Sequence, residues 1–276
     1  MSARNPLNAP ISRRAMLAGS TVAAAAALAG CKKSDADGTA ASTGGSSDAV
    51  LTYHIENPTG IEPYTLEDEN AVAVAFNLFD ALTYYDYKTG ELTDLVAESH
   101  TDDDTVWTFK IRKGTKFHDG SEVTAKSFAY AWNRLCNPST GEQPSNVSYH
   151  LAMVKGYEDV TAGTATELSG VTCPDDYTLQ VELSQPYADF DYVCAAPVLS
   201  PVPEGAGAGD DYTAFAHSPI GNGPFKMKGE WEDGQYVETE AFADYANGEA
   251  PKVAGVRFNI YKDSNTAYKE LDAGSL

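Results

Sequence analysis

Hydrophobic and polar positions follow their clearest pattern between residues 105 and 138. Apolar and polar residues alternate over residues 106–111, which predicts a strand with one buried face. A second short apolar piece around Phe117 lies between two bends that contain glycine. From Thr124, whose hydroxyl can cap a helix, apolar positions recur at helical spacing until Asn137 and Pro138 end the helix. The pattern therefore predicts strand, turn, short strand and capped helix.

The same two periodicities continue on both sides of this block. Residues 71–82 form an apolar run at helical spacing, and residues 177–183 alternate as a strand does. The chain therefore mixes strands with helices, as in the α/β class. The other expected elements are a strand over 49–55, helical segments over 147–156 and 157–162, a bend at 174–176, a strand pair over 227–240, a strand over 252–260 and a helix over 263–271.

The first 30 residues contain three basic residues and no acidic one, followed by a short Ala-rich apolar segment. This combination is typical of a signal peptide and is too short for a convincing membrane span. Arg13 and Arg14 belong to a stretch that resembles the twin-arginine export motif. Residues 28–31 resemble a bacterial lipobox, in which the Cys31 thiol receives a diacylglycerol. The alternative is a short helical N-terminus with an incidental cysteine, but the order of the three signals favours export.

Residues 31–48 are mostly Ser, Thr, Gly, Ala and Asp. Such a segment cannot bury enough apolar surface to offset the entropy lost on ordering. We therefore expect a flexible tether between the membrane and the folded part.

Charge narrows the range of partners. Without the leader, sixteen basic residues face forty acidic ones, a net charge of about −24. This charge argues against nucleic acid and anionic lipid headgroups as partners, because both would be repelled. The 42% hydrophobic content is ample for a globular core.

Three cysteines follow the lipobox, namely Cys136, Cys173 and Cys194. An oxidising compartment permits one disulfide among them and leaves one thiol over. We favour Cys173 with Cys194, because both flank the same predicted strand, although three unpaired thiols fit the sequence equally well. No Cys or His spacing indicates a zinc site.

The block over residues 105–138 resembles the signature of the family 5 extracellular solute-binding proteins. These are the oligopeptide-, dipeptide- and nickel-binding receptors of ABC importers. The resemblance extends, with gaps, from about Thr52 to Leu276, through elements such as Ile61-Glu62-Pro63 and the glycine-rich stretch 220–225. The last motif, over residues 267–276, ends one residue short of its acid, so we expect a fragment of a longer protein.

The resemblance implies a periplasmic-binding-protein-like α/β fold of type II, cluster C. It implies a first ligand lobe over 49–79 and 201–276, an inserted α/β domain over 80–200, and a second lobe outside this sequence. It places the signature block in the inserted domain, away from the ligand.

The resemblance also places first-lobe contacts with a bound peptide just after Pro63. A carboxylate there could accept hydrogen bonds from a cationic side chain or a peptide N–H. Equally, the acids could form a solvated first helical turn that complements the helix dipole. Asn222 could contact a peptide backbone, or its flanking glycines could serve only a tight turn. The candidate ligand-binding residues are Glu67, Asp68, Glu69, Asn70 and Asn222.

Catalytic motifs are missing from the sequence: it has no G-x-S-x-G, no H-E-x-x-H and no P-loop. We therefore expect no catalysis, cofactor or metal. The sequence and the resemblance together predict a substrate-binding lipoprotein of an ABC importer, anchored to the outer face of the cytoplasmic membrane. It would capture oligopeptides and deliver them to the permease. The alternatives are a receptor of the same fold for a nickel chelate, a sugar or haem, and an exported lipoprotein hydrolase.

Overall fold

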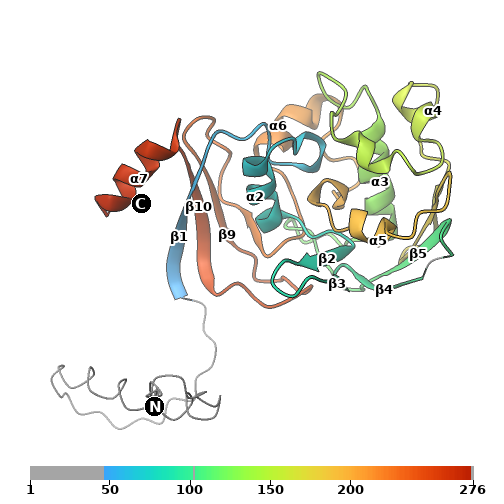
Figure 1. Ribbon diagram of the computed structural model, residues 1–276, viewed down its shortest axis with the longest axis horizontal. Helices are drawn as coiled ribbons and strands as arrows, with labels where there is room; N and C mark the ends of the chain where they lie inside the picture. The colour runs from blue at the N-terminus through green and yellow to red at the C-terminus, as the bar shows by residue number, and fades with distance from the viewer. Residues whose placement is uncertain (1–46, 102, 275–276) are drawn as a thin grey trace, which may run out of the picture. The chain divides into compact units, whose positions relative to one another are not determined.

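The first sheet combines strands from both ends of the folded chain. The computed structural model describes residues 47–101 and 103–274. The sheet has the order β1-β10-β9-β8, in which β1 is parallel to β10 and the other neighbours are antiparallel. Figure 1 shows β1, β10 and β9 next to one another. Its strands, which confirm the predictions over 49–55, 227–240 and 252–260, are β1 (Ser47–Ile55), β8 (Phe225–Met227), β9 (Tyr236–Ala241) and β10 (Val253–Ile260).

The second large sheet is built only from the middle of the sequence. It is antiparallel throughout, with the order β4-β5-β7-β6, and a separate hairpin of β2 and β3 precedes it. On β5, Trp107, Phe109 and Ile111 are each at most 1% exposed, as the period-two pattern predicts. The strands are β2 (Thr83–Asp86), β3 (Glu91–Asp94), β4 (Ala97–Thr101), β5 (Val106–Ile111), β6 (Val171–Asp175) and β7 (Thr178–Glu182).

Helix α3 (Ala125–Cys136) confirms the capped helix of the signature block. The backbone N–H of Thr124 donates to the Ser127 hydroxyl at 3.2 Å, and Asn137 ends the helix before Pro138. The short strand expected around Phe117 is wrong. It is reduced to one bridge between Lys116 and Glu122, because the chain reverses at once through a tight glycine bend.

Helix α2 (Glu69–Leu78) begins two residues before the predicted run of 71–82 and ends four residues before its end. It begins early because the Asp68 carboxylate accepts hydrogen bonds from the backbone N–H groups of Asn70 and Ala71, at 2.8 and 3.0 Å. It ends early because Phe79 is extended and the N–H of Gly223 donates to the Leu78 carbonyl at 2.9 Å. A long-range contact thus sets the end of this helix.

The remaining elements are short. Asp263 caps the last helix, α7 (Ser264–Asp272), as expected, by accepting from the Thr266 N–H at 3.0 Å. The predicted helix over 147–156 holds only one 3-10 turn, and the expected bend at 174–176 is the end of β6 and its hairpin. The others are α4 (Tyr157–Thr161), α5 (Phe190–Val193), α6 (Tyr212–His217), η1 (Pro63–Thr65), η2 (Ser148–Leu151), η3 (Pro197–Leu199) and η4 (Gly209–Asp211).

One hydrophobic core joins the two large sheets. It contains Ile55 and Phe258 from the first sheet and Trp107, Phe109 and Leu179 from the second. The order of the strands places residues 83–182 between the segments that form the first sheet. The division into a first lobe and an inserted domain stays a prediction.

The three cysteines of the folded part are free thiols, so the favoured Cys173–Cys194 disulfide is wrong. Cys173 lies on β6 near Lys126, whereas Cys194 follows α5, and its carbonyl accepts from the Thr83 N–H on β2. The two cysteines flank the same strand in the sequence, but the fold does not bring their thiols together. Burial raises the pKa of the Cys136 thiol to about 12.

Several predictions concern residues outside the described part of the chain. They are the signal peptide over 1–30, the motif of Arg13 and Arg14, the lipobox with Cys31, and nearly all of the tether over 31–48. The last two tether residues belong to β1. No helix between residues 47 and 274 is both long and apolar enough to cross a membrane.

Candidate ligand-binding site

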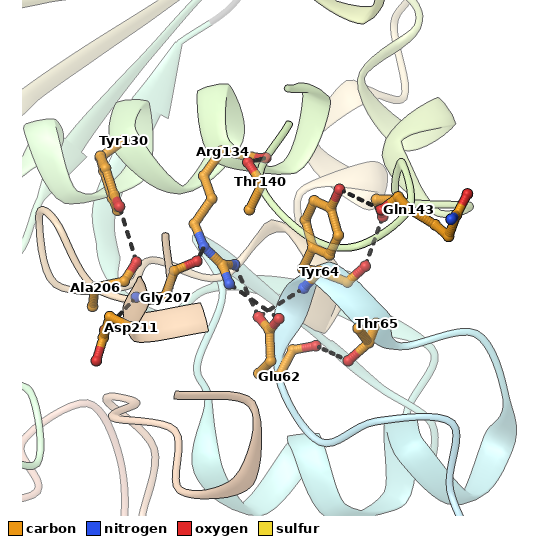
Figure 2. Close-up of polar contacts among 11 residues, drawn as sticks. Glu62, Tyr64, Thr65, Tyr130, Arg134, Thr140, Gln143, Ala206, Gly207 and Asp211 are labelled. Carbon is orange, nitrogen blue, oxygen red and sulfur yellow. Dashed lines mark hydrogen bonds and ion pairs between the residues drawn. The ribbon is translucent and has the colours of Figure 1, made fainter. Parts of the chain in front are cut away.

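A buried ion pair supports the segment that contains most of the predicted site residues. Glu62 and Arg134 are 0% and 5% exposed. The Arg134 guanidinium donates to both Glu62 carboxylate oxygens, at 2.9 and 3.1 Å, and its Nε donates to the Gly207 carbonyl at 2.6 Å (Figure 2). The rings of Tyr64 and Phe215 lie 5.4 and 5.3 Å from its central carbon. This Glu62–Arg134 anchor ties η1 to α3 and to the chain near Gly207.

The anchor extends to a second loop, over residues 142–146. Glu62 accepts from the Tyr64 N–H at 2.9 Å, which fixes the first turn of η1. The Tyr64 hydroxyl donates to the Gln143 carbonyl at 2.9 Å, and the Tyr64 carbonyl accepts from the Ser145 hydroxyl at 2.6 Å (Figure 2). Two segments about eighty residues apart in sequence are thereby held side by side.

Residues 67–70, which we name the candidate turn, follow this support directly. Exposed Glu67 accepts from the Asn146 side-chain amide at 3.0 Å. It lines a cavity of about 200 Å³, the Glu67 cavity, together with Tyr64, Thr65, Tyr212 and residues 142–146. A carboxylate here is accessible to a ligand.

The other three residues of the candidate turn have two different environments. Burial alone would raise the pKa of Asp68, but hydrogen bonds from the N–H groups of Ala71, Thr59 and Asn70 hold it below its usual value. Asp68 is therefore occupied by the protein itself. Glu69 and Asn70 line a second cavity of about 370 Å³, the Glu69 cavity. Its other lining residues are Tyr53, His54, Ile55, Glu56, Ala73 and Ser264.

Asn222 lies apart from the candidate turn and is 1% exposed. Its amide oxygen accepts from the Asp80 N–H, and its amide nitrogen donates to the Asp80 carbonyl, both at 3.0 Å. Beside it, a Cβ on Gly221 would come within 2 Å of the Leu78 carbonyl oxygen. The glycines therefore allow a close approach to the end of α2, and Asn222 braces the chain that leaves it.

A buried acid lies next to this brace. Burial raises the pKa of Asp80 to about 6, although hydrogen bonds from Asn247 and Tyr245 act against the rise. Asn247 donates to the Asp80 carboxylate at 2.9 Å and accepts from the Thr115 hydroxyl, also at 2.9 Å. This network joins the signature block to the segment after β9.

His118 joins the signature block to the glycines on either side of Asn222. Burial lowers its pKa to about 4, so the ring is neutral at pH 7. Its Nδ1 accepts from the Gly221 N–H at 3.1 Å, which leaves the proton on Nε2 to be donated to the Gly223 carbonyl at 3.2 Å. Among the described residues, no group of three or more His, Cys, Asp and Glu is arranged to hold a metal ion.

Comparison with known proteins identifies the family. The sequence model of the bacterial extracellular solute-binding proteins, family 5, matches residues 91–276. The chain belongs to this family. Family 5 consists of solute-binding proteins rather than enzymes, in agreement with the expectation of binding without catalysis.

Two curated relatives illustrate the similarity. The dipeptide-binding protein DppE of Bacillus subtilis is 31% identical over 237 residues, which are 84% of this chain and 42% of the relative. The periplasmic oligopeptide-binding protein OppA of Salmonella typhimurium is 37% identical over 175 residues, which are 61% of this chain and 31% of the relative.

Solved structures confirm the predicted periplasmic-binding-protein-like fold. The murein tripeptide binding protein MppA of Escherichia coli superposes with a TM-score of 0.73 at 27% identity, over 82% of this chain and 44% of that chain. Listeria monocytogenes OppA bound to peptide gives a TM-score of 0.72 at 25% identity, over 84% and 46%. The chain thus spans less than half the length of each of these four proteins.

Sequence reasoning located the candidate turn but missed its supports. Neither the Glu62–Arg134 anchor nor the 142–146 loop was predicted, and Tyr212 was not singled out. One signal was present: Arg134 adjoins the apolar stripe of α3, where a buried charge requires a partner. Nothing in the sequence pointed to Glu62 as that partner, since the two residues lie 72 positions apart.

Proposed function

We propose that this chain is the first part of a peptide receptor of an ABC importer, and that the candidate turn contacts the bound peptide. The observation that carries the proposal is the candidate turn itself. Exposed carboxylates of Glu67 and Glu69 line two cavities, directly after a segment fixed by a fully buried ion pair. A rigid support under exposed polar groups is what a binding site requires, because less ordering entropy is lost on binding.

The names of the relatives support peptide as the ligand. DppE is named as a dipeptide-binding protein, OppA as an oligopeptide-binding protein, and the Listeria protein was solved with peptide bound. In this chain, Glu67 and Glu69 would accept from a peptide N–H or a cationic side chain. In this proposal Asp68 and Asn222 support the site and do not contact the peptide, since the Asp68 carboxylate and the Asn222 amide are hydrogen-bonded to the backbone of this chain.

The proposal includes the architecture of the whole receptor. Residues 49–79 and 201–276 would form the first lobe and residues 80–200 an inserted domain. A second lobe outside this sequence would close over the peptide about a hinge. The protein would be exported, guided by Arg13 and Arg14, lipid-anchored at Cys31 to the outer face of the cytoplasmic membrane, and would deliver peptide to the permease.

Native mass spectrometry of the full-length protein purified from cells tests the ligand. We expect the purified protein to carry bound peptides, whose masses disappear from the complex after denaturation. After refolding, the protein should bind peptides again from a defined mixture. A protein that carries no peptide, and that no peptide mixture stabilises against heat, would contradict the proposal. For the anchor, Cys31→Ser should release the protein from the membrane fraction, whereas Cys136→Ser should not.

A further inference from the structure

A third cavity, which we name the aromatic cavity, is lined by residues from α2, from β2 and its turn, and from the segment from α5 to η3. Its volume is about 430 Å³. None of its lining residues is charged, and five of the nine are aromatic. They are Val72, Phe76, Tyr84, Tyr85, Tyr87, Tyr192, Ala195, Ala196 and Pro197.

The uncharged lining is unusual for this molecule. The chain has forty acidic residues, and four other cavities in its described part each contain at least one of them. Those acids include Glu98 in one cavity and Asp233 in another. A cavity without any charge in so acidic a protein fits an uncharged occupant, because burying a charge against this wall would leave it without a partner.

Several aromatic rings that line the aromatic cavity are exposed to solvent, so a bound ligand could bury them. Phe76, Tyr84 and Tyr192 are 40%, 43% and 49% exposed. Tyr85 stands between two neighbours, with its ring centroid 5.1 Å from that of Tyr87 and 6.0 Å from that of Tyr192. Clustered exposed aromatic rings bury large apolar areas on binding, while their hydroxyls stay in water at the rim.

One face of α2 connects the aromatic cavity with the candidate turn. Glu69 and Ala73 line the Glu69 cavity, and Val72 and Phe76 line the aromatic cavity. Residues three and four positions apart share one face of a helix. The seven steps from Glu69 to Phe76 rise about 10 Å, at ~1.5 Å per residue. An extended peptide covers that distance in about three residues.

We propose that the aromatic cavity is a side-chain subsite for the same ligand, and that it takes an uncharged aliphatic or aromatic side chain. That side chain would belong to the peptide residue about three positions from the one held at the candidate turn. The peptide would therefore run along α2. This inference rests on the proposed function and specifies the class of peptide that the site prefers.

A phenylalanine scan of alanine pentapeptides tests the subsite in the full-length protein. One phenylalanine is moved from the second to the fifth position, and affinities are measured by calorimetry. We expect one position to bind on the order of tenfold more tightly than the all-alanine peptide, because that position buries a phenyl ring. Glutamate at the same position should remove the gain.

Two cavity variants and one control locate the effect. Tyr192→Ala and Phe76→Ala change exposed side chains, so both proteins should fold. Each should reduce the ratio between the affinities for the best phenylalanine peptide and for the all-alanine peptide, because the phenyl ring loses more apolar contact than the alanine methyl. Tyr268→Ala, which removes a tyrosine that is 68% exposed on α7, should leave the gain intact.

The outcomes separate this inference from the proposed function. If peptides bind but the scan is flat, or if the gain survives in both cavity variants, the subsite is wrong and peptide binding stands. If no pentapeptide binds but other peptides do, the subsite is wrong and peptide binding stands. If no peptide of any length binds, both fail. Binding of the neutral sugar maltotriose that Tyr192→Ala abolishes, with no preference for phenylalanine, would also overturn the subsite.

Discussion

The signature block over residues 105–138 and the candidate turn over 67–70 are opposite kinds of structure. In the block, the large side chains are buried, including Trp107, Phe117 and Trp132 at 0–1% exposure. In the candidate turn, Glu67 and Glu69 are exposed and line cavities. The block carries the sequence pattern typical of the family, whereas the turn offers the chemistry for a ligand.

The structure also shows that the two regions are coupled. Arg134 belongs to the block, yet its guanidinium is bonded to Glu62, five residues before the candidate turn. A second junction joins the block to the chain beyond the far end of α2. There Thr115 donates to Asn247, which donates to Asp80, and His118 accepts from the Gly221 N–H. The residues that preserve the fold therefore also determine where the exposed carboxylates lie. Changes in each region should separate these two roles.

The largest effect is expected from breaking the anchor. Arg134→Met should leave the Glu62 carboxylate buried with a single backbone N–H as partner, at a cost of about 3–5 kcal/mol in the free energy of unfolding. Urea denaturation measures this change. Lys252→Met, which breaks an exposed ion pair with Glu249, is the control and should have no measurable effect.

The double variant sharpens this test. Combining Glu62→Gln with Arg134→Met removes the unpaired charge, so the protein should regain part of the stability lost in the single variant. A single variant that unfolds at the same urea concentration as the wild type would contradict the role of the anchor.

The next effect concerns the buried acid of the second junction. The folded-state pKa of Asp80, about 6, lies above the ordinary value of 3.8, so the folded protein favours the protonated form. Between pH 4 and 6 the folded state therefore binds more protons than the unfolded state, and stability falls as pH rises through this window. Above pH 6, the buried carboxylate costs about 3 kcal/mol relative to a neutral group.

Asp80→Asn should remove this cost and keep an oxygen that accepts from Asn247. Measured by urea denaturation, its stability relative to the wild type should be higher by up to about 3 kcal/mol at pH 7, and the difference should shrink towards pH 4. His118 has the opposite sign. Its pKa is lowered from 6.5 to about 4, so it makes the protein more stable as pH rises from 4 to 6.5. A difference between Asp80→Asn and wild type that is constant with pH would rule out titration of Asp80.

Local patterns predicted what local physics determines. Alternation over β5 and the apolar stripe and caps of α3 were sufficient, because their residues bury the same faces in the structure. The cap of α7 was also readable from Asp263. The prediction failed where a distant segment determines the end of a helix. Helix α2 ends at Leu78, whose carbonyl accepts a hydrogen bond from the N–H of Gly223, about 145 positions away in sequence.

The candidate site also combines features that the local sequence predicts with features that depend on distant segments. Acidic residues at 67–70 were visible in the sequence, but their alternatives could not be separated without the fold. Asp68 proves to be a helix cap, while Glu67 and Glu69 line cavities. The 142–146 loop carries no motif, and only the hydrogen bonds to Tyr64 bring it to the site.

The smallest change in stability, and the most direct test of the candidate turn, is expected from Glu67→Gln. Glutamine keeps an oxygen that accepts from Asn146, so the free energy of unfolding should not change measurably. Affinity for a lysine-containing peptide should fall about three- to fivefold, because an exposed charge pair is lost. Calorimetry at low salt measures this loss, and salt should reduce it.

Glu98→Gln provides the matched control for that experiment. It removes the same charge from an exposed position on β4, in the second large sheet and outside the candidate turn. A protein with a net charge near −24 attracts cationic peptides at long range, and both variants weaken this attraction equally. Only a contact at the candidate turn makes Glu67→Gln the weaker binder of the two. Equal affinities would assign the effect to net charge and would place the cationic end of the peptide away from Glu67.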